Sequence, residues 1–210
     1  MRKAIIFTGG GAPASLNKSI LSDAAFVVAA DSGYDTARML GCKVDLCVGD
    51  FDSTRFSSEI ENLEHVRSLR DKDESDTLLA MRSVFDRGID EYVLIGGGGY
   101  RMDHLFTTFA LFDSCLPPTH WFTAYETLVL VKGYHRFENL STRDTISFLP
   151  AGFSSPVVVT AKQLQWPLEN HLLSMQTLSL SNRPTNSFLD VFVQGGKSLF
   201  ACFPVADKQV

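Results

Sequence analysis

The sequence predicts an α/β protein in which a Rossmann-like, mostly parallel sheet with helices is followed by an all-β C-terminal domain. In the first 120 residues, short apolar runs alternate with stretches of helical periodicity, which is the pattern of βαβ units. From about residue 121, Thr, Val, Phe, Ser and Leu dominate, and polar and apolar residues alternate as in half-buried strands. Of the 210 residues, 45% are hydrophobic and 20% are charged, so the chain can bury a substantial core.

The N-terminal part contains four apolar runs that are predicted buried strands: 4–7, 26–30, 46–48 and 92–95. Glycines or acids follow each run. The segments 35–40 and 77–85 place apolar residues at spacings of three and four and are predicted helices, as is the apolar stretch 105–112. Strands that alternate with helices in this way favour a mostly parallel sheet.

In the C-terminal part, alternation over 144–149 and 188–193 predicts strands, and Gly-containing turns at 150–152 and 194–197 separate them from their neighbours. The sequence contains no internal repeat and no low-complexity linker. Because composition and patterning change from about residue 121, we predict two domains, 1–125 and 126–210.

Composition excludes several classes of protein. No apolar run approaches the roughly 20 residues that a bilayer requires, and glycines follow the first apolar run too soon for a signal peptide, so we expect a cytoplasmic protein with no membrane partner. The cysteines, residues 42, 47, 115 and 202, form no C-x-x-C pair, which indicates reduced thiols rather than a zinc site or a disulfide framework.

The net charge of −5 argues against nonspecific binding to nucleic acid, which requires clustered Lys and Arg. The charge is uneven along the chain. Residues 1–120 hold 12 basic and 18 acidic side chains (12 − 18 = −6), whereas residues 121–210 hold 7 and 6 (7 − 6 = +1). An acidic region of this kind is a solvated surface or a cluster of ligands for a hard cation.

Acids follow two of the predicted strands. Asp31 follows the strand 26–30, and Asp50 and Asp52 follow the strand 46–48. Ligands of open α/β sheets gather at the carboxyl ends of strands, and alternate residues of an extended segment point the same way. Asp50 and Asp52 are therefore a candidate Mg²⁺ site, although a turn in which their side chains accept backbone hydrogen bonds explains the pattern equally well.

A second acidic segment, 71–76, precedes the predicted helix 77–85 and has four acids in six residues. Asp73 can cap this helix, and Asp76 can lie in its first turn. Those roles explain one or two of the acids, and a metal or cationic substrate would explain the others.

Four glycines, 96–99, follow the strand 92–95, and Arg101 and His104 come directly after them. Such a run is tolerated where the main chain must approach a ligand closely, and a phosphate would suit glycine amides, a helix N-terminus and a guanidinium group. The run matches neither the dinucleotide-binding nor the P-loop pattern. His104 is either a general base or a residue that caps the helix.

Taken together, these motifs resemble those of the thiamine pyrophosphokinase family. The family's ordered pattern is an acid after the second strand, G-D-F-D-S, D-K-D-x-S/T-D and G-G-x-R-x-D-H, and the matching positions are Asp31, 49–53, 71–76 and 98–104. The resemblance continues into the β region, where 165–169 is similar to an aromatic-Pro-Leu segment and 180–182 to a Ser-Asn motif.

The resemblance implies an α/β catalytic domain (1–125) that binds ATP and Mg²⁺, and a β-sandwich domain (126–210) that binds thiamine and forms a homodimer with shared sites. The implied reaction moves the pyrophosphoryl group of ATP to thiamine and releases AMP. One departure concerns thiamine. Family members often have an aromatic residue shortly after Ser-Asn that stacks on the pyrimidine ring, whereas Arg183, Pro184 and Thr185 stand here.

The resemblance also implies roles for individual residues. Metal binding falls to Asp50, Asp52 and Asp76, and catalysis to these acids with Arg101 and Asp103. Nucleotide binding involves Asp31, Ser53, Asp73, Gly98, Arg101 and His104, and thiamine binding involves Ser181 and Asn182.

Two other functions compete with this one. The segment 50–54 resembles the D-x-D-x-T loop of haloacid-dehalogenase phosphatases, in which the first Asp, here Asp50, becomes phosphorylated. In those enzymes the loop follows the first strand, whereas here two predicted strands precede the one that carries the loop. A nucleotide-sensing module would use the same acids to bind Mg²⁺-nucleotide without turnover.

Overall fold

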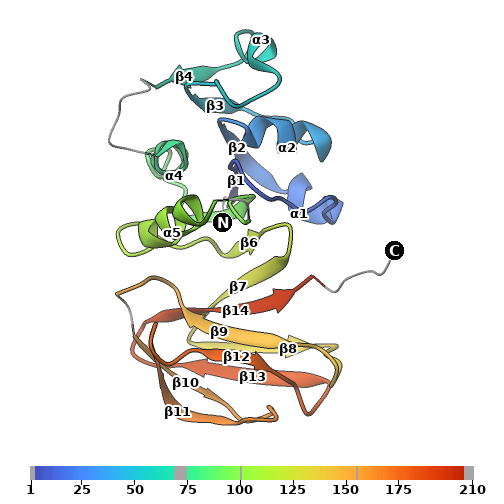
Figure 1. Ribbon diagram of the computed structural model, residues 1–210, viewed down its shortest axis with the longest axis vertical. Coiled ribbons are helices and arrows are strands. Elements are labelled where there is room, and N and C mark those ends of the chain that lie inside the picture. The colour runs from blue at the N-terminus through green and yellow to red at the C-terminus, as the bar shows by residue number, and fades with distance from the viewer. Residues whose placement is uncertain (1–2, 69–74, 100, 155, 206–210) are drawn as a thin grey trace. The chain divides into compact units, whose positions relative to one another are not determined.

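The computed structural model describes residues 3–68, 75–99, 101–154 and 156–205 (Figure 1). The chain divides into two compact units. Unit 1 comprises Met1–Thr108 and Pro118–Tyr125, and unit 2 comprises Phe109–Pro117 and Glu126–Val210. Among the described residues, no helix is long and apolar enough to cross a membrane.

Unit 1 is built on parallel strands, as the sequence predicts. The strands are β1 (Lys3–Phe7), β2 (Ala24–Ala30), β3 (Leu46–Gly49), β4 (His65–Arg67), β5 (Glu91–Ile95) and β6 (His120–Phe122). They lie in the order β6-β5-β1-β2-β3-β4, and each neighbouring pair is parallel. Since the chain leaves β1 toward β2 on one side and reaches β5 on the other, the strand order reverses beside β1, where open α/β sheets bind ligands.

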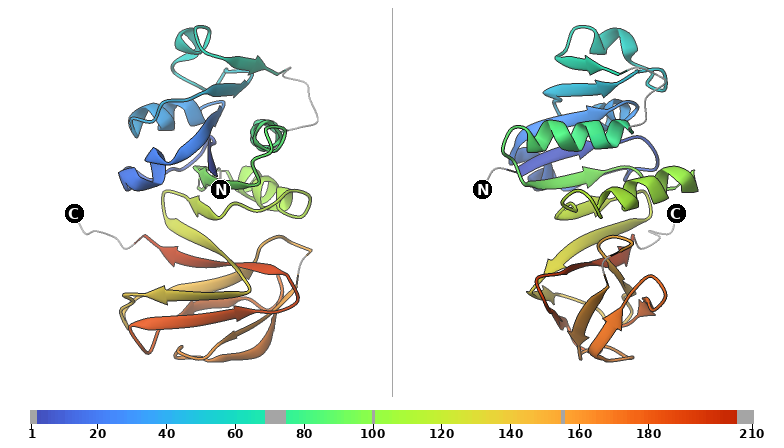
Figure 2. Two further views of the ribbon diagram at one scale, coloured as in Figure 1. Left: turned by 180° about the vertical axis from the view of Figure 1, so that it is seen from behind. Right: turned by 90° about the vertical axis from the view of Figure 1, so that its left-hand side faces the viewer.

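Helices flank this sheet. They are α1 (Lys18–Ser22), α2 (Gly33–Met39), α3 (Ser57–Ile60), α4 (Asp76–Phe85) and α5 (Met102–Leu111). Helices α2 and α4 lie on opposite faces of the sheet, as Figures 1 and 2 both show. Because both faces are covered, the central strands are buried along almost their whole length, which explains why they are apolar runs rather than alternating patterns.

In unit 1, the elements that the sequence analysis missed are short. Helix α1 has five residues and buries none of them, α3 has four residues, and β4 has three. Strand β6 pairs with β5 in parallel, and it lies within the predicted first domain, 1–125, although the composition changes from about residue 121. Its three residues are too few to show a period, although Trp121 is fully buried.

Unit 2 contains two antiparallel sets of strands. The first has the order β12-β9-β14-β7, with β7 (Glu126–Lys132), β9 (Ile146–Pro150), β12 (Ser179–Asn182) and β14 (Ser198–Pro204). The second has the order β11-β10-β13-β8, with β8 (Tyr134–Glu138), β10 (Val157–Ala161), β11 (Leu168–Leu173) and β13 (Phe188–Val193). Burial alternates along β9 and β10, and the buried side chains of both sets form one core.

Candidate functional site

A cavity of about 410 Å³ lies where the strands of unit 1 end. The residues that follow β1, β2 and β5 line it, together with the beginnings of α4 and α5. Predicted site residues that line it are Asp31, Ser53, Asp76, Arg101 and His104. Thr8 and Thr77 also line it, and their hydroxyl oxygens are 2.7 Å apart, which ties the end of β1 to the start of α4.

Three carboxylates meet beside this cavity. Asp31, Asp50 and Asp52 each place a carboxylate oxygen within 4.8 Å of the other two. Among the described residues, Asp31 Oδ1 is the buried side-chain oxygen that has no hydrogen-bond partner. A buried oxygen without a donor costs free energy, and a bound cation would remove that cost.

The electrostatics of Asp31 also favour a cation. Burial raises the pKa of the Asp31 carboxyl group above its usual value, and the charges of Asp76, Asp50 and Asp52 raise it further, against the hydrogen bond donated by Ser53. Carboxylate oxygens are the ligands that Mg²⁺ prefers. The three carboxylate groups, the unpartnered oxygen of Asp31 and the repulsion among the negative charges together fit a site for a divalent cation.

The backbone that carries these acids is bent in an unusual way. Asp31 and Phe51 have φ angles of 51° and 62°, in the left-handed region that residues other than glycine seldom adopt. Gly49 precedes Asp50 with a φ of 138°, and a Cβ atom there would press on Asp31. Such conformations persist where surrounding contacts enforce them, and they cluster at functional sites. Phe51, which stands between Asp50 and Asp52 in the sequence, is buried, and this burial helps to hold the backbone in its left-handed conformation.

Asp76 lies in the first turn of α4, as predicted, but the helix cap differs from the expected one. Ser75 is the cap, and its hydroxyl oxygen accepts a hydrogen bond from Leu78 N at 3.2 Å. Asp73 lies outside the described residues. Asp76 Oδ1 accepts a hydrogen bond from Ser68 Oγ at 3.1 Å, and its charge acts on Asp31. Asp76 therefore faces the cavity but stands apart from the group of three carboxylates.

Three amides of the glycine run make hydrogen bonds within the protein. The amides of Gly96, Gly97 and Gly98 donate hydrogen bonds to the carbonyl oxygens of Phe122, Gly9 and Gly11. A Cβ atom at Gly96 would overlap the carbonyl oxygen of Thr8, and one at Gly98 would overlap the Thr123 side chain. Gly96 and Gly98 are therefore required by close packing, and the amides of Gly96, Gly97 and Gly98 are bonded within the protein, whereas Gly97 and Gly99 line the cavity.

Two predicted residues at the start of α5 lie at the surface: Arg101, directly before the helix, and Asp103, in its first turn. Arg101 Nε and Nη2 donate to the carboxylate oxygens of Asp103 at 3.1 and 2.5 Å, and this contact lowers the pKa of Asp103. Arg101 and His104 line the cavity, whereas Asp103 does not.

The predicted thiamine residues lie in unit 2 and differ from each other. Asn182 is only 2% exposed, and its side chain is occupied: Oδ1 accepts from Trp166 N at 3.2 Å, and Nδ2 donates to Trp166 O at 2.8 Å. Ser181 is exposed, with a φ of 52°. Asn182 thus holds the backbone of Trp166, whose ring is 56% exposed. The sequence analysis named Trp166 only as part of the aromatic-Pro-Leu segment, 165–169, and gave it no role.

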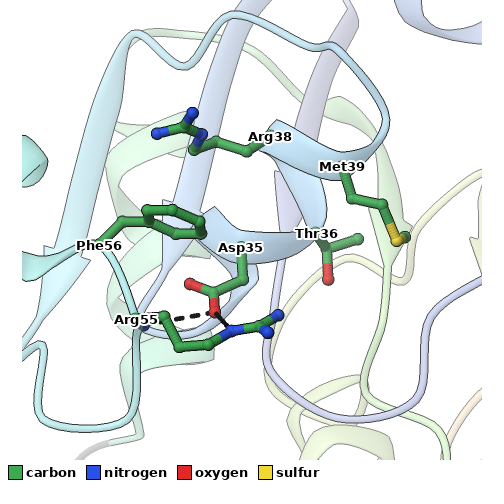
Figure 3. Close-up of a pocket in the computed structure, with 6 residues that line it drawn as sticks. All are labelled: Asp35, Thr36, Arg38, Met39, Arg55 and Phe56. Carbon is green, nitrogen blue, oxygen red and sulfur yellow. Dashed lines mark hydrogen bonds and ion pairs between the residues drawn. The ribbon is translucent and has the colours of Figure 1, made fainter.

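A second hollow of about 370 Å³ lies between α2 and the start of α3 (Figure 3). Its two arginines are paired with acids: Arg55 with Asp35, and Arg38 with Glu59. Arg38 also lies over the Phe56 ring at 4.3 Å. None of the predicted site residues lines this hollow.

Comparison with known proteins covers both parts of the chain. Residues 17–116 match the family model "Thiamin pyrophosphokinase, catalytic domain", and residues 134–192 match "Thiamin pyrophosphokinase, vitamin B1 binding domain". No curated protein gives a significant match to the sequence.

Solved structures of similar fold include a thiamine pyrophosphokinase from Bacillus subtilis, with a TM-score of 0.73 and 21% identity over 97% of this chain and 99% of that one. A thiamin pyrophosphokinase family protein from Enterococcus faecalis has a TM-score of 0.75 and 18% identity, over 99% and 100%. Thiamin pyrophosphokinase from Candida albicans has a TM-score of 0.72 and 14% identity, over 96% and 89%. At these identities the likeness shows the fold.

Proposed function

The chain belongs to the thiamin pyrophosphokinase family, whose reaction transfers the pyrophosphoryl group of ATP to thiamine, and we propose that the cavity at the strand ends of unit 1 is where it occurs. The observation that carries this assignment is the group formed by Asp31, Asp50 and Asp52, with its buried unpartnered oxygen. The phosphatase alternative is not favoured, because Asp50 follows the third strand of the unit.

We propose Mg²⁺ as the cation. Asp31, Asp50 and Asp52 would hold it, and Asp76 adds negative charge on the same side of the cavity. A bound Mg²⁺ supplies charge neutralisation on phosphate oxygens, which phosphoryl transfer requires. The residues themselves act by position: Ser53 fixes the carboxylate of Asp31 through its hydroxyl group, and the bent backbone at Phe51 keeps Asp50 and Asp52 near it.

Arg101 is the candidate contact for the polyphosphate of ATP. Its guanidinium group is exposed, lines the cavity and donates to Asp103 through Nε and Nη2, so a phosphate can compete for the same two donors. His104 lies at the same end of α5. We assign Gly98 to the packing of the turn, and nucleotide binding to side chains at the cavity.

For thiamine, we propose the exposed ring of Trp166 as the stacking surface. Thiamine carries a positive charge and an aromatic ring, and both are attracted to the face of an indole. Asn182 would then act by holding Trp166, and the exposed Ser181 would offer a polar contact. In this proposal unit 1 is a Rossmann-like catalytic domain, and unit 2 is a β-sandwich that binds thiamine.

The direct test is incubation with ATP, Mg²⁺ and thiamine, followed by measurement of AMP and thiamine diphosphate. Asp50→Asn and Asp52→Asn should each lower turnover by several orders of magnitude with the fold intact. Asp86→Asn, which changes an exposed acid just after α4, is the matched control. Normal turnover in both site variants would reject the assignment of the acids.

Thiamine binding is tested with Trp166→Ala. We expect KM for thiamine to rise while KM for ATP stays unchanged. Phe192→Ala is the control, because Phe192 is another exposed aromatic residue of unit 2, on β13. A rise in both variants, or in neither, would remove Trp166 from the thiamine site.

We also propose a homodimeric, cytoplasmic enzyme. The four cysteines are all free thiols, which suits a reducing compartment. If one reaction uses acids of one subunit and Trp166 of the other, mixing Asp52→Asn chains with Trp166→Ala chains should restore activity in mixed dimers. If confirmed subunit exchange restores none, each site belongs to one chain. Cell fractionation tests the location.

A further inference from the structure

The segment 50–55, here called the acid loop, is fastened to the β2–α2 region at two points. The first lies inside the site, where Ser53 Oγ donates to Asp31 Oδ2. The second lies outside it, at Asp35 in the first turn of α2. Asp35 Oδ1 accepts from Thr54 Oγ1 at 2.5 Å. Asp35 Oδ2 accepts from Arg55 N at 3.3 Å and from Arg55 Nε at 3.0 Å, as Figure 3 shows.

Asp35 is well placed to act as a fixed anchor. Its side chain is only 14% exposed, and α2 packs on the sheet through the buried residues Gly33, Tyr34 and Ala37. The Thr54 hydroxyl group also accepts a hydrogen bond from Phe56 N at 3.2 Å, so the anchor fixes the chain from Thr54 to Phe56, directly after the acids. The end of the acid loop is thus tied to α2, the helix that begins just after Asp31.

The simplest alternative is that Asp35 and Arg55 form an ordinary surface ion pair. The Arg55 side chain is 83% exposed, so that pair contributes little to stability. The bonds from Thr54 Oγ1 and Arg55 N differ from it, since they join Asp35 to the loop itself. Asp35 does not line the cavity and is outside the group of three carboxylates, so its hydrogen bonds to the loop are its direct link to Asp50 and Asp52.

We propose that Asp35 is a positioning residue that holds the acid loop so that Asp50 and Asp52 stay within reach of Asp31. This inference rests on the proposed function, in which these three acids bind the divalent cation. Asp50 and Asp52 repel Asp31, so without the anchor the loop can relax away and separate the carboxylates before a cation arrives. Partners that orient metal ligands typically change metal affinity by 10–100-fold when removed.

The test uses Asp35→Asn and Thr54→Val. The first replaces one acceptor oxygen by a donor that faces the Arg55 donors, and the second removes the hydroxyl group while keeping the charge of Asp35. Glu59→Gln is the control, because Glu59 pairs with Arg38 on the same surface but makes no hydrogen bond to the acid loop.

Two quantities are measured on each full-length protein. Calorimetric titration with Mn²⁺, in the absence of nucleotide and thiamine, gives cation affinity, and activity against Mg²⁺ concentration gives the half-saturating concentration and the limiting turnover. We expect roughly tenfold weaker Mn²⁺ binding in both variants, with turnover largely restored at high Mg²⁺, and no change in Glu59→Gln.

The proposal is overturned if Mn²⁺ affinity is unchanged in both variants, if it falls equally in Glu59→Gln, or if the wild type binds no Mn²⁺. Thermal unfolding in EDTA shows whether each variant is folded. If Asp35→Asn is misfolded, the Mn²⁺ affinity of Thr54→Val alone decides the test. Because the titration uses neither substrate, a wild type that binds Mn²⁺ but makes no AMP refutes the proposed function and leaves the positioning role to be judged from affinity.

Discussion

Replacing Asp31 by Asn should make the metal-free protein more stable while abolishing activity. The substitution keeps the shape of the side chain, keeps an oxygen that can accept from Ser53, and suits the positive φ angle, which Asn tolerates better than most residues. What it removes is a partly buried negative charge that faces three others, those of Asp50, Asp52 and Asp76.

The size of the effect follows from the separations. At 4.8 Å, which bounds the distances among Asp31, Asp50 and Asp52, a pair of like charges repels by about 1 kcal/mol in water and by about 3.5 kcal/mol at an effective dielectric constant of about 20. Since Asp52 is exposed, we expect a net gain of about 1–3 kcal/mol. For a chain of this size that raises the melting temperature by roughly 2–12 °C.

Thermal unfolding is measured in EDTA and again in Mg²⁺ at saturating concentration. A cation at one hundred times its Kd stabilises the protein by about 2.7 kcal/mol, and the variant should gain less than the wild type, so the difference closes or reverses. Asp45→Asn is the control, because Asp45 Oδ2 accepts from Val27 N outside the site; it should lose stability equally in both conditions. A lower melting temperature of Asp31→Asn in EDTA would refute the account of the three acids as a strained, cation-dependent group.

Three further outcomes follow from the structure. Hydrogen bonds from Arg136 and Tyr134 hold the pKa of Asp190 at about 2, below its ordinary value of 3.8, so Asp190 stabilises the fold above pH 4 and this contribution is lost as the pH falls toward 2. The melting temperatures of wild type and Asp190→Asn should therefore differ at pH 7 and converge near pH 2. Gly96→Ala should prevent folding or sharply lower the yield of soluble protein, because the new methyl group overlaps backbone atoms of Thr8; normal denaturation curves would contradict this. Met81→Ala should lower the free energy of unfolding by about 2–5 kcal/mol in chemical denaturation, since the side chain is fully buried, and a loss under 1 kcal/mol would show that the core closes over the gap.

The sequence predicted best those strands that are buried on both faces. Apolar runs such as 92–95 are visible because a covered parallel strand needs apolar residues at every position. The approach of Asp31 to Asp50 and Asp52 was also foreseeable, since β2 and β3 are parallel neighbours and their carboxyl ends share one edge.

Features that depend on side-chain contacts between distant segments could not be predicted in this way. The glycine run suggested a phosphate cradle, but whether an amide faces a ligand or another turn depends on packing across the chain. The Ser-Asn motif likewise does not reveal that Asn182 is buried against the backbone of Trp166, sixteen residues earlier. Asp35 had no signal at all, because its partners Thr54 and Arg55 are about twenty residues away.

The interlocked turns at the ends of β1 and β5 have a consequence for the entropy of ligand binding. Glycine loses more conformational freedom on ordering than any other residue, and a loose glycine loop would lose that freedom each time a ligand arrived. Here the amides of Gly96, Gly97 and Gly98 are already bonded to neighbouring carbonyl groups, so the loss occurs once, when the protein folds. This wall of the cavity is therefore ordered before a nucleotide arrives, and its amides should exchange with solvent deuterium as slowly as those of the strands.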